Sequence, residues 1–257
     1  MTPSNEIILF CGDPHGQFRH ILQAAGDLRA SAVILLGDLE PGQPLHEELA
    51  PIAEKVWLIH GNHDSDNERN WNHLWGSKLA DRNIDGRVVT LPNGIRLAGL
   101  GGVFRESVWY PSLPTPPNFR NRKEHVRATP RQERWQGGVP LKHFSTIYPD
   151  ELDRLSSLRA DILITHEAPG YHNNGFELLD TLAQSMGVKV TVHGHHHDNL
   201  DSSERWSRQG FKSYGVGLRG ITAIDADGNA KAIVPGELDA QRDYRQKYID
   251  LFKDVAP

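Results

Sequence analysis

Six short apolar runs constrain the fold of this chain more than any other feature of its sequence. They are rich in Ile, Val and Leu, are bounded by Gly, Asp and Asn, and cover residues 6–11, 32–36, 55–59, 94–100, 161–165 and 188–192. Runs this short between turn residues are typical of buried strands rather than helices. Apolar residues with helical spacing lie between them, at 18–28 and 176–186. The alternation predicts an α/β layered fold with sheets covered by helices.

A later group of apolar segments differs from the first six because Gly-rich turns separate its members. The segments cover residues 211–216, 220–225 and 230–234, and this pattern predicts antiparallel strands. The pattern of residues 237–255 predicts a helix at the C-terminus. We therefore expect one α/β domain that spans residues 1–257.

Residues 105–149 break the alternation of strands and helices. This segment contains seven of the sixteen prolines and eight Lys or Arg residues against three Glu, so it is basic within a chain of net charge −5. High proline density without periodicity predicts a long irregular insertion, and loops of that length are usually functional or disordered. Its aromatic residues favour an ordered segment. The sequence leaves open whether the insertion covers a functional site.

The composition limits the class of protein and its surroundings. A single cysteine, Cys11, excludes an intramolecular disulfide and is typical of a reducing compartment. The N-terminal apolar run is too short for a signal sequence, and no apolar stretch approaches the length of a transmembrane helix. We therefore expect a cytoplasmic protein without a membrane partner. The acidic charge outside the insertion disfavours nonspecific nucleic-acid binding without excluding a nucleic-acid substrate.

Five of the expected strands are followed, within a few positions, by residues whose side chains can bind metal ions, mostly beside a glycine. They are Asp13, His15, Asp38, Asn62, His63, Asp64, His166 and the four histidines of residues 193–197. The carboxyl ends of parallel strands share one edge of a sheet, so we expect these side chains to meet in space. Carboxylate, imidazole and amide oxygen suit Mn, Fe, Zn or Co better than calcium, and no thiolate takes part. Several such ligands are consistent with two neighbouring ions.

The metal-binding motifs follow one another in a characteristic order. From Asp13 to His197 they read Asp-x-His, Gly-Asp, Gly-Asn-His-Asp, a lone His and Gly-His-x-His. In this order they resemble the calcineurin-like metallophosphoesterase family. The resemblance implies a two-sheet α/β/β/α sandwich. It also implies a metal-dependent phosphoric ester hydrolase with two divalent transition metal ions, with Mn as the first candidate and Fe, Zn or Co as alternatives.

The resemblance also implies a role for each motif residue. The implied ligands form two sets and a bridge: Asp13, His15 and His197 for one ion, Asn62, His166 and His195 for the other, and Asp38 between them. A hydroxide between the ions would attack phosphorus. His63, oriented by Asp64, would protonate the leaving oxygen. Asn62 would also contact the substrate.

The histidines of residues 193–197 cannot all have the same role. In an extended segment only alternate positions share a face, so His195 and His197 are expected to point into the site together. His193 and His196 are expected to be strand-end histidines with local hydrogen bonds rather than ligands.

The first motif, CGDPHGQF, is similar to that of the protein Ser/Thr phosphatase branch of the family. That branch continues after its second motif with Asp-Arg-Gly, where the arginine grips phosphate, whereas this chain reads GDLEPGQ. Another cation must then bind the phosphate. Arg105 is the best candidate, ahead of Arg122, Lys123 and Arg127.

The expected substrate is therefore a phosphorylated small molecule, either a phosphomonoester or a nucleotide. A phosphodiester or a phosphoprotein remains an alternative within the enzyme class. An alternative from another class is a non-catalytic metal-binding scaffold, although all seven ligand positions and His63 are present. The sequence leaves the oligomeric state open.

Overall fold

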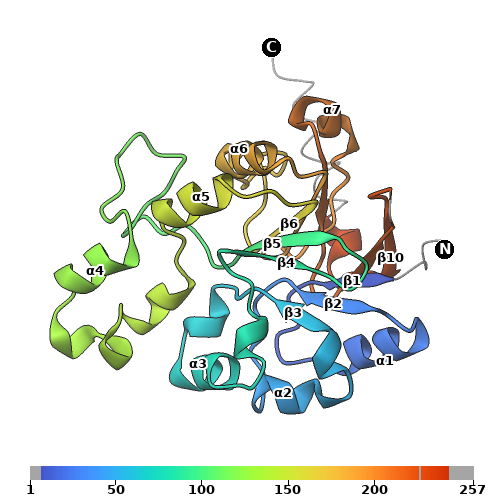
Figure 1. Ribbon diagram of the computed structural model, residues 1–257, viewed down its shortest axis with the longest axis horizontal. Coiled ribbons are helices and arrows are strands. Elements are labelled where there is room, and N and C mark those ends of the chain that lie inside the picture. The colour runs from blue at the N-terminus through green and yellow to red at the C-terminus, as the bar shows by residue number, and fades with distance from the viewer. Residues whose placement is uncertain (1–6, 226, 243–257) are drawn as a thin grey trace.

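Two five-stranded sheets pack face to face in the computed structural model, which describes residues 7–225 and 227–242 (Figure 1). The first sheet has the strand order β10-β9-β1-β2-β3, and the second has the order β4-β5-β6-β7-β8. The strands of the first sheet are β1 (Ile8–Cys11), β2 (Ala32–Leu35), β3 (Val56–Leu58), β9 (Ile221–Ile224) and β10 (Ala230–Val234). Those of the second sheet are β4 (Arg87–Thr90), β5 (Arg96–Leu100), β6 (Ile162–Thr165), β7 (Val190–His193) and β8 (Lys212–Gly215).

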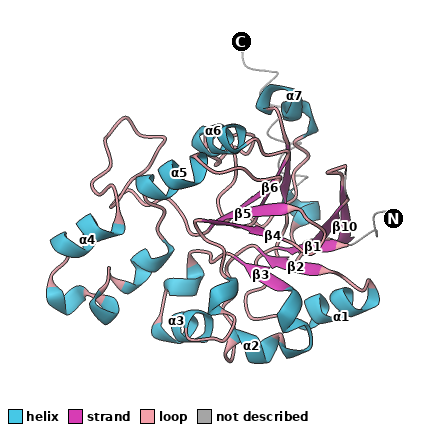
Figure 2. Cartoon of the chain, in the orientation of Figure 1, coloured by secondary structure: helices cyan, strands magenta, loops and turns pink. Residues whose placement is uncertain are grey.

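Helices lie on both sides of the sheets (Figure 2). The α-helices are α1 (Arg19–Asp27), α2 (Leu45–Glu48), α3 (Glu68–Trp75), α4 (Arg122–Ala128), α5 (Pro149–Ser156), α6 (Glu177–Met186) and α7 (Trp206–Gln209). Shorter 3-10 helices occur at Ala50–Lys55, His63–Ser65, Ala80–Arg82, Arg131–Glu133, Trp135–Gly137, Leu141–Ser145 and Ser203–Arg205. Within the described parts of the chain, no helix combines the length and the apolar character needed to cross a membrane.

The strand directions bring the predicted ligands to one edge of each sheet. β1, β2 and β3 run parallel to one another, and so do β5, β6, β7 and β8. β9 is antiparallel to β1, β10 to β9, and β4 to β5. The loops after β1, β2 and β3 leave the carboxyl edge of the first sheet, and those after β6 and β7 leave the same edge of the second. These five loops carry the predicted metal ligands.

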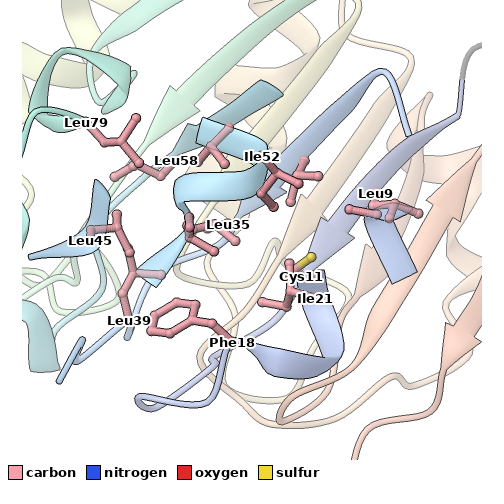
Figure 3. Packing of buried hydrophobic residues seen from close by; sticks show 14 of the residues in the cluster. Leu9, Cys11, Phe18, Ile21, Leu35, Leu39, Leu45, Ile52, Leu58 and Leu79 are labelled. Carbon is pink, nitrogen blue, oxygen red and sulfur yellow. The ribbon is translucent and has the colours of Figure 1, made fainter. Parts of the chain in front are cut away.

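Alternate residues of the central strands face opposite sides and so build separate apolar layers. Ile8 and Phe10 of β1 pack between the two sheets, together with Ile164 of β6. Leu9 and Cys11 face the other way, into the layer between the first sheet and helices α1 and α2 (Figure 3). A third layer joins the second sheet to helices α5 and α6. The predicted α/β/β/α sandwich is confirmed.

The strand predictions are confirmed for all six early runs, and residues 177–186 form α6 as predicted. The later group is only partly antiparallel. β9 and β10 are antiparallel neighbours, but β8 lies in the second sheet, parallel to β7. The Gly-rich turn after β8 carries the chain to the first sheet instead of closing a hairpin. There the amide of Gly12 donates to the carbonyl oxygen of Gly220 at 3.1 Å.

Strand β4 has no counterpart in the sequence prediction. It lies at the edge of the second sheet, and its four residues are exposed or half-buried. It therefore lacks the apolar run that marks a strand buried on both faces. The predicted C-terminal helix at 237–255 lies largely outside the described residues.

The insertion, residues 105–149, consists of loops, helix α4 and several 3-10 helices at the left of Figure 1. Arg122 of α4 holds it together. Its guanidinium donates to Glu151 Oε1 at 3.1 Å and to three carbonyl oxygens at 3.0–3.3 Å, those of His143, Phe144 and Thr146. These bonds occupy the guanidinium with acceptors of the insertion and of α5. Arg122 is therefore not the phosphate ligand that the sequence offered as an alternative.

Substitution of Leu97, in β5, tests whether the apolar layer between the sheets stabilises the fold. Its side chain is fully buried there, so Leu97→Ala removes apolar contacts and leaves a cavity. We expect the free energy of unfolding to fall by about 2–5 kcal/mol. Leu113→Ala, at a side chain that is 44% exposed, is the matched control and should change it by less than about 0.5 kcal/mol. Urea denaturation followed by circular dichroism measures both, and equal losses would contradict the assigned layer.

Candidate metal centre

The loops at the strand ends position the site residues through left-handed backbone conformations. Six of their non-glycine residues have positive φ: Asp13 (37°), His15 (41°), Asp38 (51°), Glu40 (43°), His195 (68°) and His197 (57°). Such conformations cost of order 1–3 kcal/mol each and persist only where the surrounding structure imposes them. Here the amide of His15 donates to the carbonyl oxygen of Asp38 at 3.0 Å, which locks two of these loops together.

Two glycines allow the loops to approach one another closely. Gly37 precedes Asp38 and has a φ of 101°, and a side chain there would meet the ring of His166 and the backbone of Gly61. A side chain at Gly61 would in turn meet Asp38 and His166. Glycine at both positions therefore lets the loops after β2, β3 and β6 converge.

One group of ligand atoms comes from the loops after β1, β2 and β7. His15, Asp38 and His197 offer atoms that all lie within 4.8 Å of one another. The Nε2 atoms of His15 and His197 face each other at 3.2 Å. The other ring nitrogen of His15, Nδ1, bonds to the carboxylate of Glu40 at 2.5 Å. Because an ionised carboxylate can only accept, Nδ1 carries the proton, and Nε2 of the neutral ring presents its lone pair to the group.

A second group shares one residue with the first. Asp38, His166 and His195 also offer ligand atoms within 4.8 Å of one another. Nδ1 of His166 donates to the carbonyl oxygen of Leu36 at 2.7 Å, so Nε2 offers a lone pair to the site when the ring is neutral. That atom lies 3.4 Å from the carboxylate of Asp38 and 3.2 Å from the amide oxygen of Asn62. Lone pairs that face one another in this way are stabilised by a cation between them.

Asp13 lies beside the second group. Its carboxylate accepts the backbone amide of His195 at 3.0 and 3.1 Å and lies 3.9 Å from Nδ1 of His166. It belongs to neither group of three ligand atoms, so its place with His15 and His197 stays a prediction. Asp13 is fully buried, and this burial raises its pKa to about 8.

The donor chemistry of the two groups fits divalent transition metal ions. Imidazole nitrogen, carboxylate and amide oxygen form a mixed set that suits Mn, Fe, Zn or Co. Burial would lower the pKa of His166, but Asp38 and Asp13 raise it to about 10, so this part of the site favours a positive charge. Burial also opposes ionisation of Asp38, yet His166 holds the pKa of that carboxyl well below its usual range. Metal ions would supply this charge and leave the ligands unprotonated.

His63 lies at the edge of the two groups, with its ring centroid 5.6 Å from that of His15. Its backbone amide donates to the Asp38 carboxylate at 2.8 Å, and its Nδ1 bonds to the Asp66 carboxylate at 2.6 Å. Partial burial lowers the pKa of His63, but Asp38 and Asp66 outweigh it and raise that pKa above its ordinary value. The side chain is 44% exposed, so the ring is open to a molecule bound at the site.

The predicted contact between Asp64 and the His63 ring is wrong. Asp64 is buried, and its carboxylate accepts three backbone amides at 2.8–3.1 Å, those of Leu39, Glu40 and Gly61. The 3-10 turn at His63–Ser65 sends the two neighbouring side chains in different directions. Asp64 therefore ties the loop after β2 to the loop after β3. Asp66, one helical turn further on, holds the ring instead.

His193 and His196 lie outside both groups of ligand atoms. His193 bonds to the hydroxyl of Tyr171 at 2.6 Å and to the carbonyl oxygen of Gly194 at 2.9 Å, which is the local bonding that the sequence predicts. His196 instead stacks on the ring of His172, with 4.0 Å between centroids, and its Nε2 is buried without a hydrogen-bond partner.

His195 and His197 both join a ligand group, but for a different reason from the one predicted. They are not alternate residues of an extended segment, because β7 ends at His193 and both residues have positive φ. The left-handed turns direct His195 to the group with His166, and His197 to the group with His15.

Arg105 is half-buried beside these loops. Its guanidinium donates to Ser145 Oγ at 3.4 Å, and that hydroxyl lies 3.4 Å from the carbonyl oxygen of Asn62. Lys123 and Arg127, the other two cations considered from the sequence, are exposed on α4. The fold therefore brings Arg105 next to a predicted ligand residue.

The sequence did not predict three carboxylates as site residues: Glu40, Asp66 and Glu167. The first two hold imidazole rings, as described above. Glu167 is buried, accepts the amide of Phe104 at 3.2 Å and lies 3.8 Å from Nε2 of His195. This burial raises its pKa to about 7. Each of the three lies within four residues of a predicted ligand, but acidic residues are too common at turns for that spacing to identify them.

The chain belongs to the calcineurin-like phosphoesterase family, whose model matches residues 7–199. An uncharacterized protein of Haemophilus influenzae is 41% identical over 225 residues, which cover 87% of this chain and 95% of that protein. The crystal structure of the protein TT1561 of Thermus thermophilus is similar with a TM-score of 0.55 and 13% identity, covering 90% of this chain and 99% of that one. This second likeness concerns the fold alone.

Two neighbouring histidines offer a matched test of the ligand groups. His195→Ala removes an atom of the second group and should lower the bound metal from two ions per chain toward one. His196→Ala removes a ring outside both groups and should leave the metal content unchanged. Elemental analysis after loading with Mn(II) and gel filtration counts the ions, and circular dichroism checks the fold. Equal losses in both variants would contradict the grouping.

Proposed function

We propose that this chain is a dinuclear metal-dependent phosphoric ester hydrolase. The observation that carries the proposal is that two groups of ligand atoms share Asp38, the arrangement needed to hold two ions close together. Asn62 lies within reach of the second group, and Asp13, proposed to bind the ion held by His15 and His197, completes the proposed ligand set. Manganese is the first choice among the ions that suit this donor set, followed by Fe, Zn and Co.

The protein residues prepare the site for phosphate chemistry. When bound, two divalent ions would neutralise a phosphate group and lower the pKa of a water molecule toward neutrality. The protein fixes the donor atoms that face the ions: Glu40 holds the ring of His15, and the Leu36 carbonyl holds the ring of His166. Such outer partners orient the ring and make its inner nitrogen a better ligand.

His63 is the proposed general acid. Asp66 accepts from its Nδ1 at 2.6 Å, which fixes the ring, and the same carboxylate favours the protonated form. The half-exposed ring stands next to the first ligand group and can give a proton to the leaving oxygen of a bound ester. Asp66 replaces Asp64 as the residue that positions this acid.

The proposed substrate is a phosphate ester of a small molecule rather than nucleic acid. Outside the insertion the chain has an acidic balance, which opposes contact with a long phosphate backbone. The single cysteine, Cys11, is free and buried in β1, which is consistent with the proposed cytoplasmic location.

Metal removal tests the proposed reaction. The chain loaded with Mn(II) should hydrolyse p-nitrophenyl phosphate, a chelator should abolish turnover, and Mn(II) should restore it. Ca(II) is the control ion and should restore little activity, because the donor set is rich in nitrogen. Release of p-nitrophenolate measures each rate. Tight Mn(II) binding without turnover of any ester would favour the non-catalytic scaffold instead.

His63→Ala tests the proposed acid through the leaving group. Phenyl phosphate has a poorer leaving group than p-nitrophenyl phosphate and so depends more on protonation. We expect kcat for phenyl phosphate to fall about 10²- to 10⁴-fold, and kcat for p-nitrophenyl phosphate to fall less. Metal content should stay unchanged, as elemental analysis would show. An equal loss on both esters would assign His63 to another role, and no loss would remove it from the reaction.

A further inference from the structure

Arg105 presents a guanidinium at the site with few protein partners. It follows the end of β5 by five residues, where the insertion begins. One terminal nitrogen makes the long bond to Ser145 Oγ, while Nε is buried without a hydrogen-bond partner. Across the residues that the structure describes, the arginines within 4.0 Å of a carboxylate do not include Arg105. Its charge is therefore not neutralised by a direct ion pair.

Ser145 fixes the place of this guanidinium relative to the ligand groups. It is fully buried, and its hydroxyl lies 2.6 Å from Ser65 Oγ and 3.4 Å from the carbonyl oxygen of Asn62. Ser65 ends the 3-10 turn that begins at His63. Arg105 is thus held at the same turn that carries the proposed acid.

Nearby carboxylates act on Arg105 without pairing with it. The charges of Asp66, Glu167 and Asp38 all act on the guanidinium. Glu167 accepts the amide of Phe104, the residue before Arg105, so its carboxylate lies close in space to this part of the chain. Burial lowers the pKa of Arg105, and these negative charges partly offset that effect. Within the described residues the guanidinium keeps an unpaired Nε and no direct ion pair, so it can still bind a ligand.

The two kinds of phosphate ester differ in what they offer such a group. A monoester has three terminal oxygens and carries up to two negative charges. A diester has two terminal oxygens and one charge, and a carbon substituent replaces the third oxygen. A guanidinium donates two parallel hydrogen bonds to phosphate oxygens, and these charge-assisted bonds are stronger than neutral ones. A carbon substituent facing the guanidinium would leave its half-buried donors unpaired.

We infer that Arg105 selects phosphate monoesters over diesters by binding a terminal oxygen that only the monoester has. This inference rests on the proposed hydrolase function and names its substrate class. It is specific to Arg105 among the cations of the insertion that the sequence singled out. Arg122 is committed to Glu151 and backbone carbonyls, while Lys123 and Arg127 are exposed on α4.

Kinetics on paired substrates test the inference. The Mn(II)-loaded chain should show a higher kcat/KM for p-nitrophenyl phosphate than for bis-p-nitrophenyl phosphate. Arg105→Met should lower kcat/KM for the monoester about 10- to 100-fold, the loss expected for one charge-assisted contact. It should change the value for the diester less than about threefold. Arg105→Lys should recover part of the loss. Arg127→Met, an exposed arginine of the same insertion, is the matched control and should change neither value.

Calorimetry gives a second readout that needs no turnover. Inorganic phosphate stands for the monoester and dimethyl phosphate for the diester, each titrated into the Mn(II)-loaded protein. Arg105→Met should weaken the binding of phosphate about as much as it lowers monoester kcat/KM, with unchanged metal content. The binding of dimethyl phosphate should hardly change.

The outcomes separate the two proposals. Equal losses on both esters, or a wild-type preference for the diester, would overturn the selection by Arg105 while leaving the hydrolase function in place. No hydrolysis of either ester would overturn the hydrolase function. Calorimetry would then decide the inference alone: phosphate binding that does not depend on Arg105 would overturn it, and selective loss in Arg105→Met would support it.

Discussion

A buried hydrogen bond of 2.7 Å, from Nδ1 of His166 to the carbonyl oxygen of Leu36, joins the two sheets at the centre of the site. Leu36 directly follows β2 in the first sheet, and His166 directly follows β6 in the second. Breaking this bond would leave two polar groups unpaired away from water. The bond also fixes which nitrogen of His166 faces Asp38 and Asn62. The packing of the sandwich and the geometry of the ligand groups therefore depend on the same contact.

A common rule governs the imidazole rings around this contact. In three of them the outer nitrogen is held by an oxygen of the protein, and the inner nitrogen is left for the site. The pairs are His15 with Glu40, His63 with Asp66 and His166 with the Leu36 carbonyl. The outer partner sets the tautomer of each ring and limits its rotation. The charge of the outer partner also affects the basicity of the ring, because a carboxylate raises this basicity more than a backbone carbonyl does.

The sequence predicts the ligands better than it predicts their partners. Ligands such as Asp38 and His166 come within three residues of a strand end, so local pattern alone places them at the edge of a sheet. Partners depend on how separate loops meet. Asp66 holds His63 only because a 3-10 turn sends Asp64 toward backbone amides, and β8 joins the second sheet although its spacing matches a hairpin. Tertiary contacts determine which partner a ring has and which sheet a strand joins, and a local sequence pattern does not contain these contacts.

The left-handed conformations at the site have a consequence for how this protein can change over generations. Replacing Asp38 or His197 by glycine would remove both a ligand side chain and the backbone strain that goes with it. Mutational drift toward a more stable fold therefore runs against the ligands themselves. A lineage released from selection on the site would lose these residues early and remain well folded. Descendants without them would be expected to persist as sound structures.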